Sequence, residues 1–345
     1  MELPKTPLPN FFGAPRKSVD SFFIGHFSKR NFRVHTNHTL TLTTSPFHGL
    51  WIALVTPFRD GAVDHPALHT LVTSLCKQGA SGFVACGSTG EAAALSADEQ
   101  IATLKTVRDA AQGLAVVMGV SGYHLADMVE WIEELNTHAK HNTPAEPIAG
   151  VLVPAPNYIR PSQSGLVQWF TAIADASAAP VIVYDIPYRT GMRIDTATLL
   201  ALAGHPNIQA VKDCGGDVQK TQALINDGRL QVLAGEDTQI FSAMCLGAHG
   251  AISAGAHLHT RRIARVIALL EGGHLHLARE LWQPIPGLME VLFAEPNPAL
   301  IKAFFAQQGR MTDELRAPMA TATLGALRRL LEIDASIADQ TTAPA

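Results

Sequence analysis

The chain has 345 residues, of which 47% are hydrophobic and 16% are charged, so it can bury a large core as one big barrel or as two ordinary domains. Its formal net charge is −4 and it has no long basic run, which excludes the electrostatic footprint of a nucleic-acid-binding protein. No stretch of about 18 apolar residues lacks a charge, so we expect no membrane span.

Residues 1–46 differ in composition from the rest of the chain. They hold six of the fourteen phenylalanines, and their basic residues outnumber the acidic ones, with Lys5, Arg16, Lys17, Lys29, Arg30 and Arg33 against Glu2 and Asp20. No apolar stretch of about 7–15 residues forms the core of a secretory signal. The composition resembles an organelle transit peptide, and a disordered leader is the alternative. We favour the disordered leader and a cytoplasmic location.

From Gly49 onward, short apolar runs alternate with helical stretches, at a spacing close to thirty residues for the early units. The runs, which predict strands, span residues 50–55, 82–86, 115–120, 148–153, 181–184, 208–211, 232–233 and 250–253. Ser96 and Glu99 form a capping box that opens a helix over residues 98–111. Helical spacing predicts further helices at 66–78, 127–138, 166–176, 195–203 and 239–246.

Eight short strands, each followed by a helix, predict an α/β fold of the (β/α)8 TIM-barrel class, whose usual size of ~200–250 residues matches. An open doubly wound sheet also alternates, but the glycine cluster of a dinucleotide site does not follow the first run. The alternation then stops, and a C-terminal helical appendage is predicted, with helices at 261–271, 275–284, 286–294, 298–308 and 319–333. We expect a barrel over 47–258, the last barrel helix and the appendage over 259–335, and a disordered tail over 336–345.

Active-site residues of such a barrel lie at the C-terminal ends of its strands. Lys212 ends the apolar run 208–211 and precedes a glycine-rich turn. Burial there lowers the pKa of the ammonium and leaves a free amine that can attack a carbonyl. A surface lysine with its stem along the strand is the alternative, but the position of Lys212 in the repeating pattern favours catalysis.

Two other strand ends carry polar groups. Ser88 and Thr89 lie between Gly87 and Gly90, in a turn whose N–H groups and hydroxyls suit a carboxylate, although a plain strand-to-helix turn has the same residues. Tyr184 ends the strand before that of Lys212, so its hydroxyl can reach the lysine and relay protons. A tyrosine that packs on a helix is the alternative.

The segments 87–91 (GSTGE), 184–191 (YDIPYRTG) and 211–213 (VKD) resemble the dihydrodipicolinate synthase / N-acetylneuraminate lyase family of class I aldolase-like barrels. The resemblance covers about residues 48–335. Within the family, the synthases are matched by three features: Arg189, which sialic-acid lyases lack, and the segments 246–253 (LGAHGAIS) and 295–298 (EPNP).

The resemblance implies that Lys212 condenses with pyruvate to an imine, whose enamine adds to L-aspartate-4-semialdehyde in lysine and diaminopimelate biosynthesis. It also implies a role for each of the other site residues. Tyr184 would donate and accept protons, Ser88 would link it to Tyr158 of a neighbouring subunit in a homotetramer, and the substrates would contact Thr56, Thr89, Arg189, Gly235 and Ile252.

Several positions depart from the family pattern. Asp185 replaces the usual asparagine after the strand-five tyrosine and adds a carboxylate near the site, and His257 replaces a common asparagine after strand eight. The pocket in which many bacterial synthases bind lysine as a feedback inhibitor corresponds to Ala97, Gln100, Tyr123, Asp127 and Asn157, and only Asp127 keeps the family's chemistry.

Two alternatives to a synthase remain open at the level of sequence. One is a pyruvate lyase that cleaves a 2-keto-3-deoxy sugar acid, against which Arg189 argues. The other is a non-catalytic barrel that binds a small carboxylate, against which the joint presence of Lys212, Tyr184, Ser88 and Tyr158 argues.

The scattered Cys76, Cys86, Cys214 and Cys245 form no CxxC pair, so we expect reduced thiols, no metal ion and no other cofactor.

Overall fold

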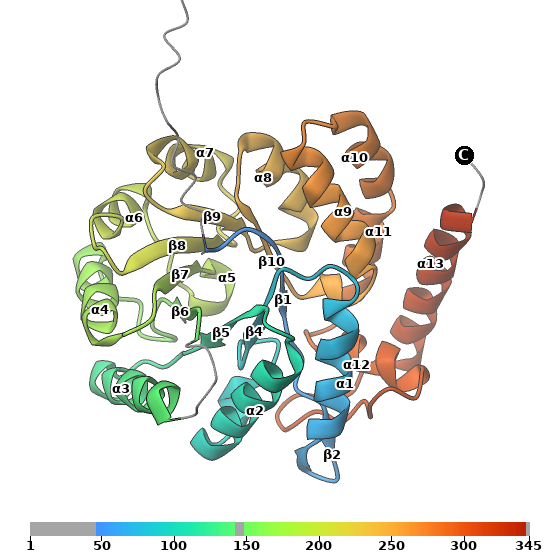
Figure 1. The fold of residues 1–345 in the computed structure, drawn as a ribbon, viewed down its shortest axis with the longest axis horizontal. Helices are drawn as coiled ribbons and strands as arrows, with labels where there is room; N and C mark the ends of the chain where they lie inside the picture. Colours follow the sequence, from blue (N-terminus) through green and yellow to red (C-terminus); the bar gives the residue numbers. More distant parts are fainter. Residues whose placement is uncertain (1–45, 142–147, 343–345) are drawn as a thin grey trace, which may run out of the picture. The chain divides into compact units, whose positions relative to one another are not determined.

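Eight parallel strands close into a barrel in the computed structural model, which describes residues 46–141 and 148–342. Around the barrel they follow the order β1-β10-β9-β8-β7-β6-β5-β4 (Figure 1). Their bounds are β1 Gly49–Ala53, β4 Gly82–Ala85, β5 Ala115–Gly119, β6 Gly150–Pro154, β7 Val181–Asp185, β8 Ile208–Asp213, β9 Gln231–Ala234 and β10 Gly250–Ser253. Nearly every strand residue is buried, because side chains fill the interior and helices cover the outside.

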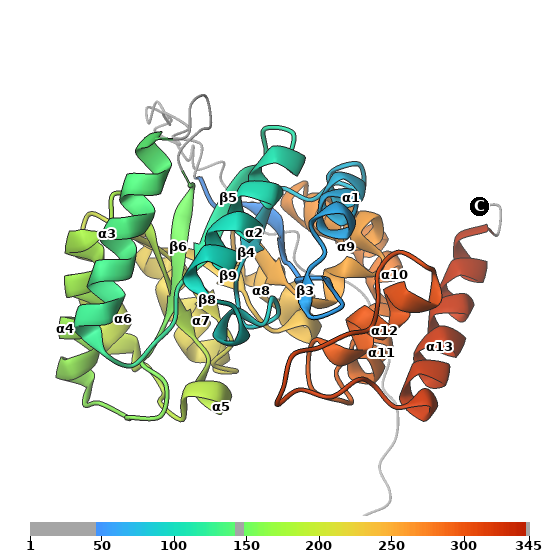
Figure 2. The same cartoon turned by 90° about the horizontal axis from the view of Figure 1, so that it is seen from below.

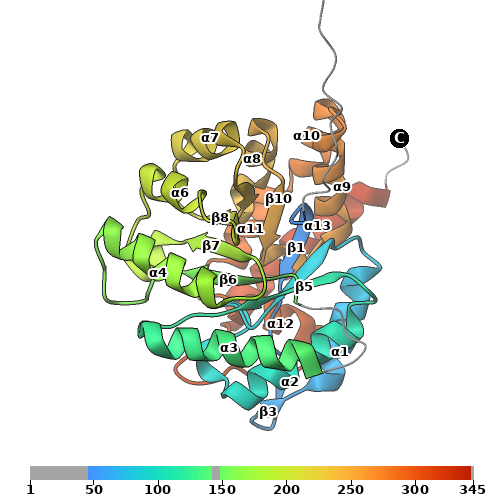
Figure 3. The ribbon, with the colours of Figure 1, turned by 60° about the vertical axis from the view of Figure 1, so that its left-hand side comes forward.

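A ring of helices surrounds the strands, as the sequence predicts for a (β/α)8 barrel (Figure 3). The ring consists of α1 His65–Cys76, α2 Ala97–Ala110, α3 Leu125–His141, α4 Gln163–Ala176, α6 Thr196–Leu202, α7 Val218–Asp227, α8 Ile240–Leu246 and α9 Thr260–Glu271. The predicted capping box is present at the start of α2, where Ser96 and Glu99 exchange hydrogen bonds with each other's backbone N–H.

Short elements follow several strands at their C-terminal ends, where the active site of such a barrel lies. A two-stranded antiparallel hairpin follows β1, and a single turn of helix follows β7. The hairpin consists of β2 Phe58–Arg59 and β3 Ala62–Val63, the helical turn is α5 Pro187–Thr190, and the 3-10 turns are η1 Ala92–Ala94, η2 Asp237–Gln239 and η3 Gly255–His257.

The C-terminal appendage is helical, as predicted, and lies to one side of the barrel (Figure 2). Its helices are α10 Leu275–Trp282, α11 Ile285–Leu292, α12 Ala299–Gln307 and α13 Leu324–Thr342, with α10 packed on α9 and α13 on α11 and α12. None of the helices in the described ranges is long and apolar enough to cross a membrane.

Two predictions concern the ends of the chain, a disordered tail and a disordered leader. The prediction of a disordered tail from residue 336 is wrong over residues 336–342, because α13 continues to Thr342. Ile337 is 1% exposed, so this last part of α13 still buries apolar surface, which stabilises the helix. The leader predicted for residues 1–46 lies outside the described residues, except for Pro46.

Helix α7 is absent from the predicted elements. Its buried side chains are Lys220, Thr221 and Leu224, so two of the three are polar and the apolar periodicity that marks a helix is missing. Asp217 begins the helix, because its side chain accepts hydrogen bonds from the N–H groups of Gln219 and Lys220.

Candidate active site

Lys212 and Tyr184 lie side by side at the C-terminal ends of β8 and β7. The parallel register pairs the two residues directly, and the Lys212 Nζ atom lies 4.4 Å from the centroid of the Tyr184 ring. Both side chains line a cavity of about 640 Å³ at the mouth of the barrel. The structure therefore brings together the amine and the phenol that the sequence analysis singled out.

Burial changes the pKa of both groups and favours the neutral form of each. Lys212 is 6% exposed, and burial lowers the pKa of its ammonium, although the negative charges of Asp237 and Glu236 act in the opposite direction. Tyr184 is also buried, and the same desolvation raises the pKa of its phenol. A neutral amine is a nucleophile and a neutral phenol is a proton donor, so the pair suits carbonyl chemistry.

The turn after β4 brings Ser88 and Thr89 to the same cavity. Ser88 shares a hydrogen bond with Tyr184. Thr89 is buried, and its hydroxyl accepts a hydrogen bond from Asn297 Nδ2 at 2.9 Å, across the gap to the C-terminal appendage. Thr56 supports this turn from below, since its hydroxyl donates to the carbonyl of Gly90 at 2.8 Å.

Arg189 and Gly235 also line the cavity. Arg189 lies on α5 directly after the strand of Tyr184. Gly235 follows β9, and a Cβ atom at this position would collide with Cys214 Sγ and lie 2.9 Å from Lys212 Cγ, so the absence of a side chain leaves room beside the lysine.

Three predicted site residues do not line the cavity. Ile252 is wholly buried in β10 and Thr56 reaches the site only through Gly90. Tyr158 is 91% exposed on the loop after β6, with a positive φ of 73°. Within one chain, the structure therefore makes the Ser88–Tyr184 half of the predicted hydroxyl relay but not the link to Tyr158.

Sequence reasoning gave no role to several groups that the fold brings next to Lys212. Asp237 is buried, accepts hydrogen bonds from the Ser253 hydroxyl and from Gly255 N–H at 2.9 Å, and has its pKa raised by burial to about 6. Glu236 accepts hydrogen bonds from Cys214 and Tyr188. The sequence could have pointed to Glu236 and Asp237 as site residues, because both follow the end of a predicted strand.

Two buried oxygen atoms at the cavity lack a hydrogen-bond partner among the described residues. They are Glu236 Oε1 and Asn297 Oδ1, and both residues line the cavity. Buried acceptors without a partner are costly, so a donor on a bound molecule would be favoured here.

His257, one of the departures from the family pattern, supports the fold from behind the site. Its ring is buried, and burial lowers its pKa to about 4, so the imidazole is neutral. Nδ1 donates to the carbonyl of Ala254 at 2.7 Å and Nε2 accepts from the N–H of Val55 at 3.3 Å. The residue thus ties the loop after β10 to the end of β1.

A second cavity of about 430 Å³ adjoins the first and shares Ser88, Tyr184 and Arg189 with it. Its other walls include Asn157, next to the exposed Tyr158, and the C-terminal segment 316–319. Tyr184 thus lines both cavities, and the second cavity also reaches the loop after β6.

Comparisons with known proteins show which family the chain resembles. The model of the dihydrodipicolinate synthetase family matches residues 46–333. The 4-hydroxy-tetrahydrodipicolinate synthase of Trichlorobacter lovleyi is 36% identical over 278 residues, which is 79% of this chain and 93% of that protein.

Solved structures give the same result. A dihydrodipicolinate synthase from Acinetobacter baumannii, described as chloride-inhibited and complexed with pyruvate, matches with a TM-score of 0.79 and 31% identity over 84% of this chain and 99% of that chain. One from Cyanidioschyzon merolae with lysine bound matches with a TM-score of 0.80 and 26% identity over 85% and 99%.

Proposed function

The chain belongs to the dihydrodipicolinate synthetase family, and on that premise we propose that it condenses pyruvate with L-aspartate-4-semialdehyde through a Schiff base on Lys212. The activity is that of the 4-hydroxy-tetrahydrodipicolinate synthases, lyases of lysine and diaminopimelate biosynthesis. The observation that carries the residue assignment is the desolvated Lys212 amine over the Tyr184 ring in the cavity.

The first step follows from the neutral amine of Lys212. It attacks the C2 carbonyl of pyruvate, and the carbinolamine loses water to give a protonated imine, with Tyr184 supplying the proton to the departing hydroxyl. Tyr184, now a phenolate, then takes a proton from C3. The C3–H electron pair forms the C2=C3 bond and the C=N π pair moves to the imine nitrogen, so that a neutral enamine forms.

The remaining steps use the second substrate. The enamine C3 attacks the aldehyde carbon, and Tyr184 returns a proton to the new alkoxide. The Tyr184 phenolate then takes a proton from the ammonium of the former semialdehyde. The resulting amine attacks the imine carbon, passes its extra proton to the Lys212 nitrogen and expels the Lys212 amine, which closes the ring. No metal or redox partner is needed to balance these steps.

Pyruvate binding is supported by the turn after β4. The hydrogen bonds that close this turn use the N–H groups of Gly90, Glu91 and Ala92. We propose that the N–H groups of Ser88 and Thr89, with the Thr89 hydroxyl, hold the pyruvate carboxylate, and that Gly235 leaves space beside its carbonyl. Ile252 and Thr56 would shape the floor of the site without touching the cavity.

Recognition of the semialdehyde is supported by two features of the cavity lining. Arg189 can bind its carboxylate with two parallel hydrogen bonds. The ammonium of the semialdehyde would donate to the buried acceptors Glu236 Oε1 and Asn297 Oδ1. A 2-keto-3-deoxy sugar acid has no ammonium group with which to do this. The second feature favours the amino-acid aldehyde over a 2-keto-3-deoxy sugar acid.

We also propose that a second copy of the chain completes the site, within a homotetramer built as a dimer of dimers. Tyr158, Ile159 and Tyr123 are large, exposed and grouped, since Asn157 N–H donates to Gly122 O and joins their two loops. Tyr158 of one copy would enter the 430 Å³ cavity of the other and contact Ser88. Sedimentation should show at least a dimer, and a fully active monomer would contradict this assembly.

A cytoplasmic location is proposed on the chemistry of the cysteines. The described residues hold four free thiols and no disulfide, at Cys76, Cys86, Cys214 and Cys245. Reduced thiols are typical of the cytoplasm. Thiol titration of the protein purified without reductant, and its localisation in the cell, test this proposal together.

The function is tested by a coupled assay of the purified protein with pyruvate and L-aspartate-4-semialdehyde. We expect the cyclic product to form, and we expect no cleavage of 2-keto-3-deoxy sugar acids under the same conditions. Cleavage of a sugar acid without condensation would assign the chain to the pyruvate lyases instead.

A further inference from the structure

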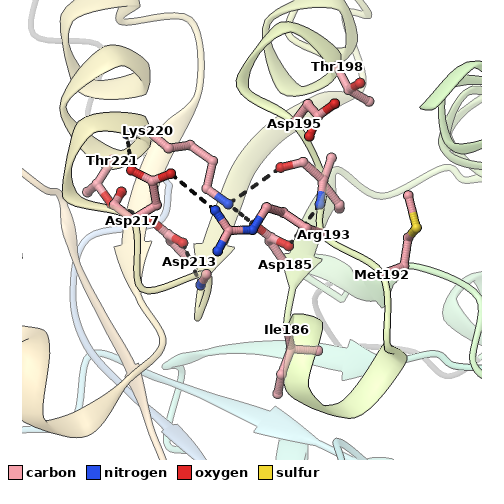
Figure 4. A network of polar contacts seen from close by, with 12 residues as sticks. Asp185, Ile186, Met192, Arg193, Asp195, Thr198, Asp213, Asp217, Lys220 and Thr221 are labelled. Carbon is pink, nitrogen blue, oxygen red and sulfur yellow. Dashed lines mark hydrogen bonds and ion pairs between the residues drawn. The ribbon is translucent and has the colours of Figure 1, made fainter. Parts of the chain in front are cut away.

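Asp185 and Lys220 form a buried ion pair directly behind the site (Figure 4). Asp185 ends β7 and is 0% exposed, while Lys220 comes from the first turn of α7 and is 3% exposed. Side chains alternate along a strand, so Tyr184 points into the cavity while its neighbour Asp185 points outward to α7. The same alternation separates Lys212 from Asp213.

The position of Lys220 is unfavourable for the helix itself. A cation in the first turn opposes the helix dipole, and a buried ammonium without a partner is costly. The chain also makes room for it: a Cβ atom at Gly215 would collide with Lys220 Nζ and lie 2.9 Å from Asp185 Oδ2. The absence of a side chain at Gly215 therefore leaves room for this ion pair in the turn after β8.

The pair holds both ends of the segment that carries Arg189. This segment runs from Ile186 to Ile194. At its start, Asp185 is fixed by the ion pair and its carbonyl accepts from Cys214 N–H at 2.8 Å. At its end, Ile194 N–H donates to Asp185 Oδ1 at 3.4 Å and the Ile194 carbonyl accepts from Lys220 Nζ at 3.4 Å.

The segment makes one further contact on the surface and one inside. Arg193 bonds to Asp217 at 3.3 Å on the surface, where an ion pair contributes little. Inside the segment, the Thr190 hydroxyl donates to the carbonyl of Ile186 at 3.1 Å. The segment is thus a closed loop whose base is the Asp185–Lys220 pair, and Arg189 lies at its far side on the cavity wall.

We propose that Lys220 and Asp185 are positioning residues for the second substrate: their ion pair closes the 186–194 segment and so aims the Arg189 guanidinium into the cavity. This proposal rests on the proposed function, because it assigns the aldehyde carboxylate to Arg189. Pyruvate is held by the turn after β4 and by Lys212, neither of which belongs to the segment. Loss of the pair therefore affects the aldehyde half of the reaction selectively.

The test uses the full-length protein and reads the two halves of the reaction separately. Borohydride trapping of pyruvate on Lys212, without aldehyde, reports the first half, and kcat/KM for the semialdehyde at saturating pyruvate reports the second. Lys220→Met should keep pyruvate trapping within about twofold and lower kcat/KM for the semialdehyde by about tenfold or more, because small displacements of a binding group are costly. Lys220→Gln keeps a donor at the same depth and should lose less, by about threefold.

Two further variants give the smallest and the largest loss of semialdehyde use to be expected. Arg193→Ala removes only the surface contact of the same segment and should behave like wild type. Arg189→Ala removes the group that the pair is proposed to aim and sets the upper limit of the loss. If Lys220→Met does not fold, Lys220→Gln carries the same comparison.

An equal loss of pyruvate trapping and semialdehyde use in the Lys220 variants, or a change in neither, would overturn the positioning role. Failure of the proposed function would look different, because wild type itself would then give no condensation.

Discussion

At the scale of single residues, the proposed chemistry depends on two side chains whose pKa values burial shifts in opposite directions. Burial lowers the pKa of Lys212 and raises that of Tyr184, so both are shifted toward their neutral forms. In the proposed mechanism the lysine is the nucleophile and the tyrosine is the proton donor. Ser88, which is hydrogen-bonded to Tyr184, is the proposed route for exchange of that proton.

Tyr184→Phe tests the proton relay. The ring still packs beneath Lys212, but the hydroxyl is lost, so we expect kcat to fall by about 10² to 10⁴. Pyruvate binding, measured by calorimetry, should change by less than about threefold. A variant that keeps more than half of wild-type kcat would remove Tyr184 from the mechanism.

Arg189→Ala tests recognition of the aldehyde carboxylate. A guanidinium binds a carboxylate with two parallel, charge-assisted hydrogen bonds, which neither alanine nor lysine can reproduce. We expect kcat/KM for the semialdehyde to fall by about 10²-fold, with pyruvate trapping nearly unchanged. Arg193→Ala, four residues further along, is the matched control. Equal losses for both substrates would point to a role in folding instead.

At the scale of elements, the sequence predicts what is local and misses what depends on packing. The strand ends carrying Ser88, Tyr184 and Lys212 follow from the alternation of apolar runs, because a parallel barrel brings all such ends to one rim. The Asp185–Lys220 pair could not be predicted, since it joins residues 35 positions apart and depends on how α7 is rotated. Helix α7 itself was missed because its buried face is polar.

The contacts between the C-terminal appendage and the rim of the barrel could not be predicted either, because they also depend on packing between distant segments. Asn297 lies in a segment that the sequence analysis noted only as a resemblance, yet it bonds to Thr89, which is 208 positions earlier. Arg316 makes a comparable contact, since its guanidinium binds both carboxylate oxygens of Glu99 at 2.6 and 2.7 Å and also the carbonyls of Ala94 and Gly61. The segment after α12 is thereby fixed over the rim of the barrel.

Arg316→Ala tests this attachment through stability. We expect the free energy of unfolding at pH 7 to fall by about 2 kcal/mol, because charge-assisted hydrogen bonds are lost. The hydrogen bond and the charge of Arg316, together with weaker hydrogen bonds from Ser96, lower the pKa of Glu99 from 4.5 to about 2. A depressed carboxyl pKa stabilises the fold above the unfolded value and loses that effect as pH falls through the folded value.

The difference between wild type and Arg316→Ala should therefore be largest near neutral pH and should shrink between about pH 4.5 and 2. Urea denaturation at pH 7 and pH 3 measures it, with Arg328→Ala on the exposed side of α13 as the control. A difference that is independent of pH would show that Glu99 is not the partner that matters.

At the scale of the whole molecule, two of the residues that the resemblance places in the lysine pocket of bacterial synthases, Gln100 and Asp127, already make hydrogen bonds within the chain. Gln100 Nε2 donates to the carbonyls of Ala92 and Leu95, both at 3.3 Å. Asp127 is paired with His124 at 2.7 Å. Ala97 has no polar side chain and Asn157 has no aromatic ring, in contrast to the groups that the resemblance implies for lysine-sensitive enzymes.

L-Lysine should therefore inhibit this protein weakly or not at all at millimolar concentrations. Each lost hydrogen bond costs about 1 kcal/mol, and an unpaired buried ammonium or carboxylate costs more. A rate assay from 0.1 to about 10 mM lysine, with a lysine-sensitive synthase run in parallel, measures this. Half-inhibition below 1 mM would show that another set of groups binds the amino acid.

We propose that Lys212 forms the covalent intermediate, and borohydride reduction in the presence of pyruvate is the direct test of this assignment. Wild type and Lys212→Ala are reduced with and without pyruvate, digested and mapped by mass spectrometry. We predict a reduced pyruvyl adduct on the peptide containing Lys212, only in wild type and only with pyruvate, while circular dichroism shows that the variant is folded. An adduct on another lysine, or an equal adduct in Lys212→Ala, would contradict the assignment.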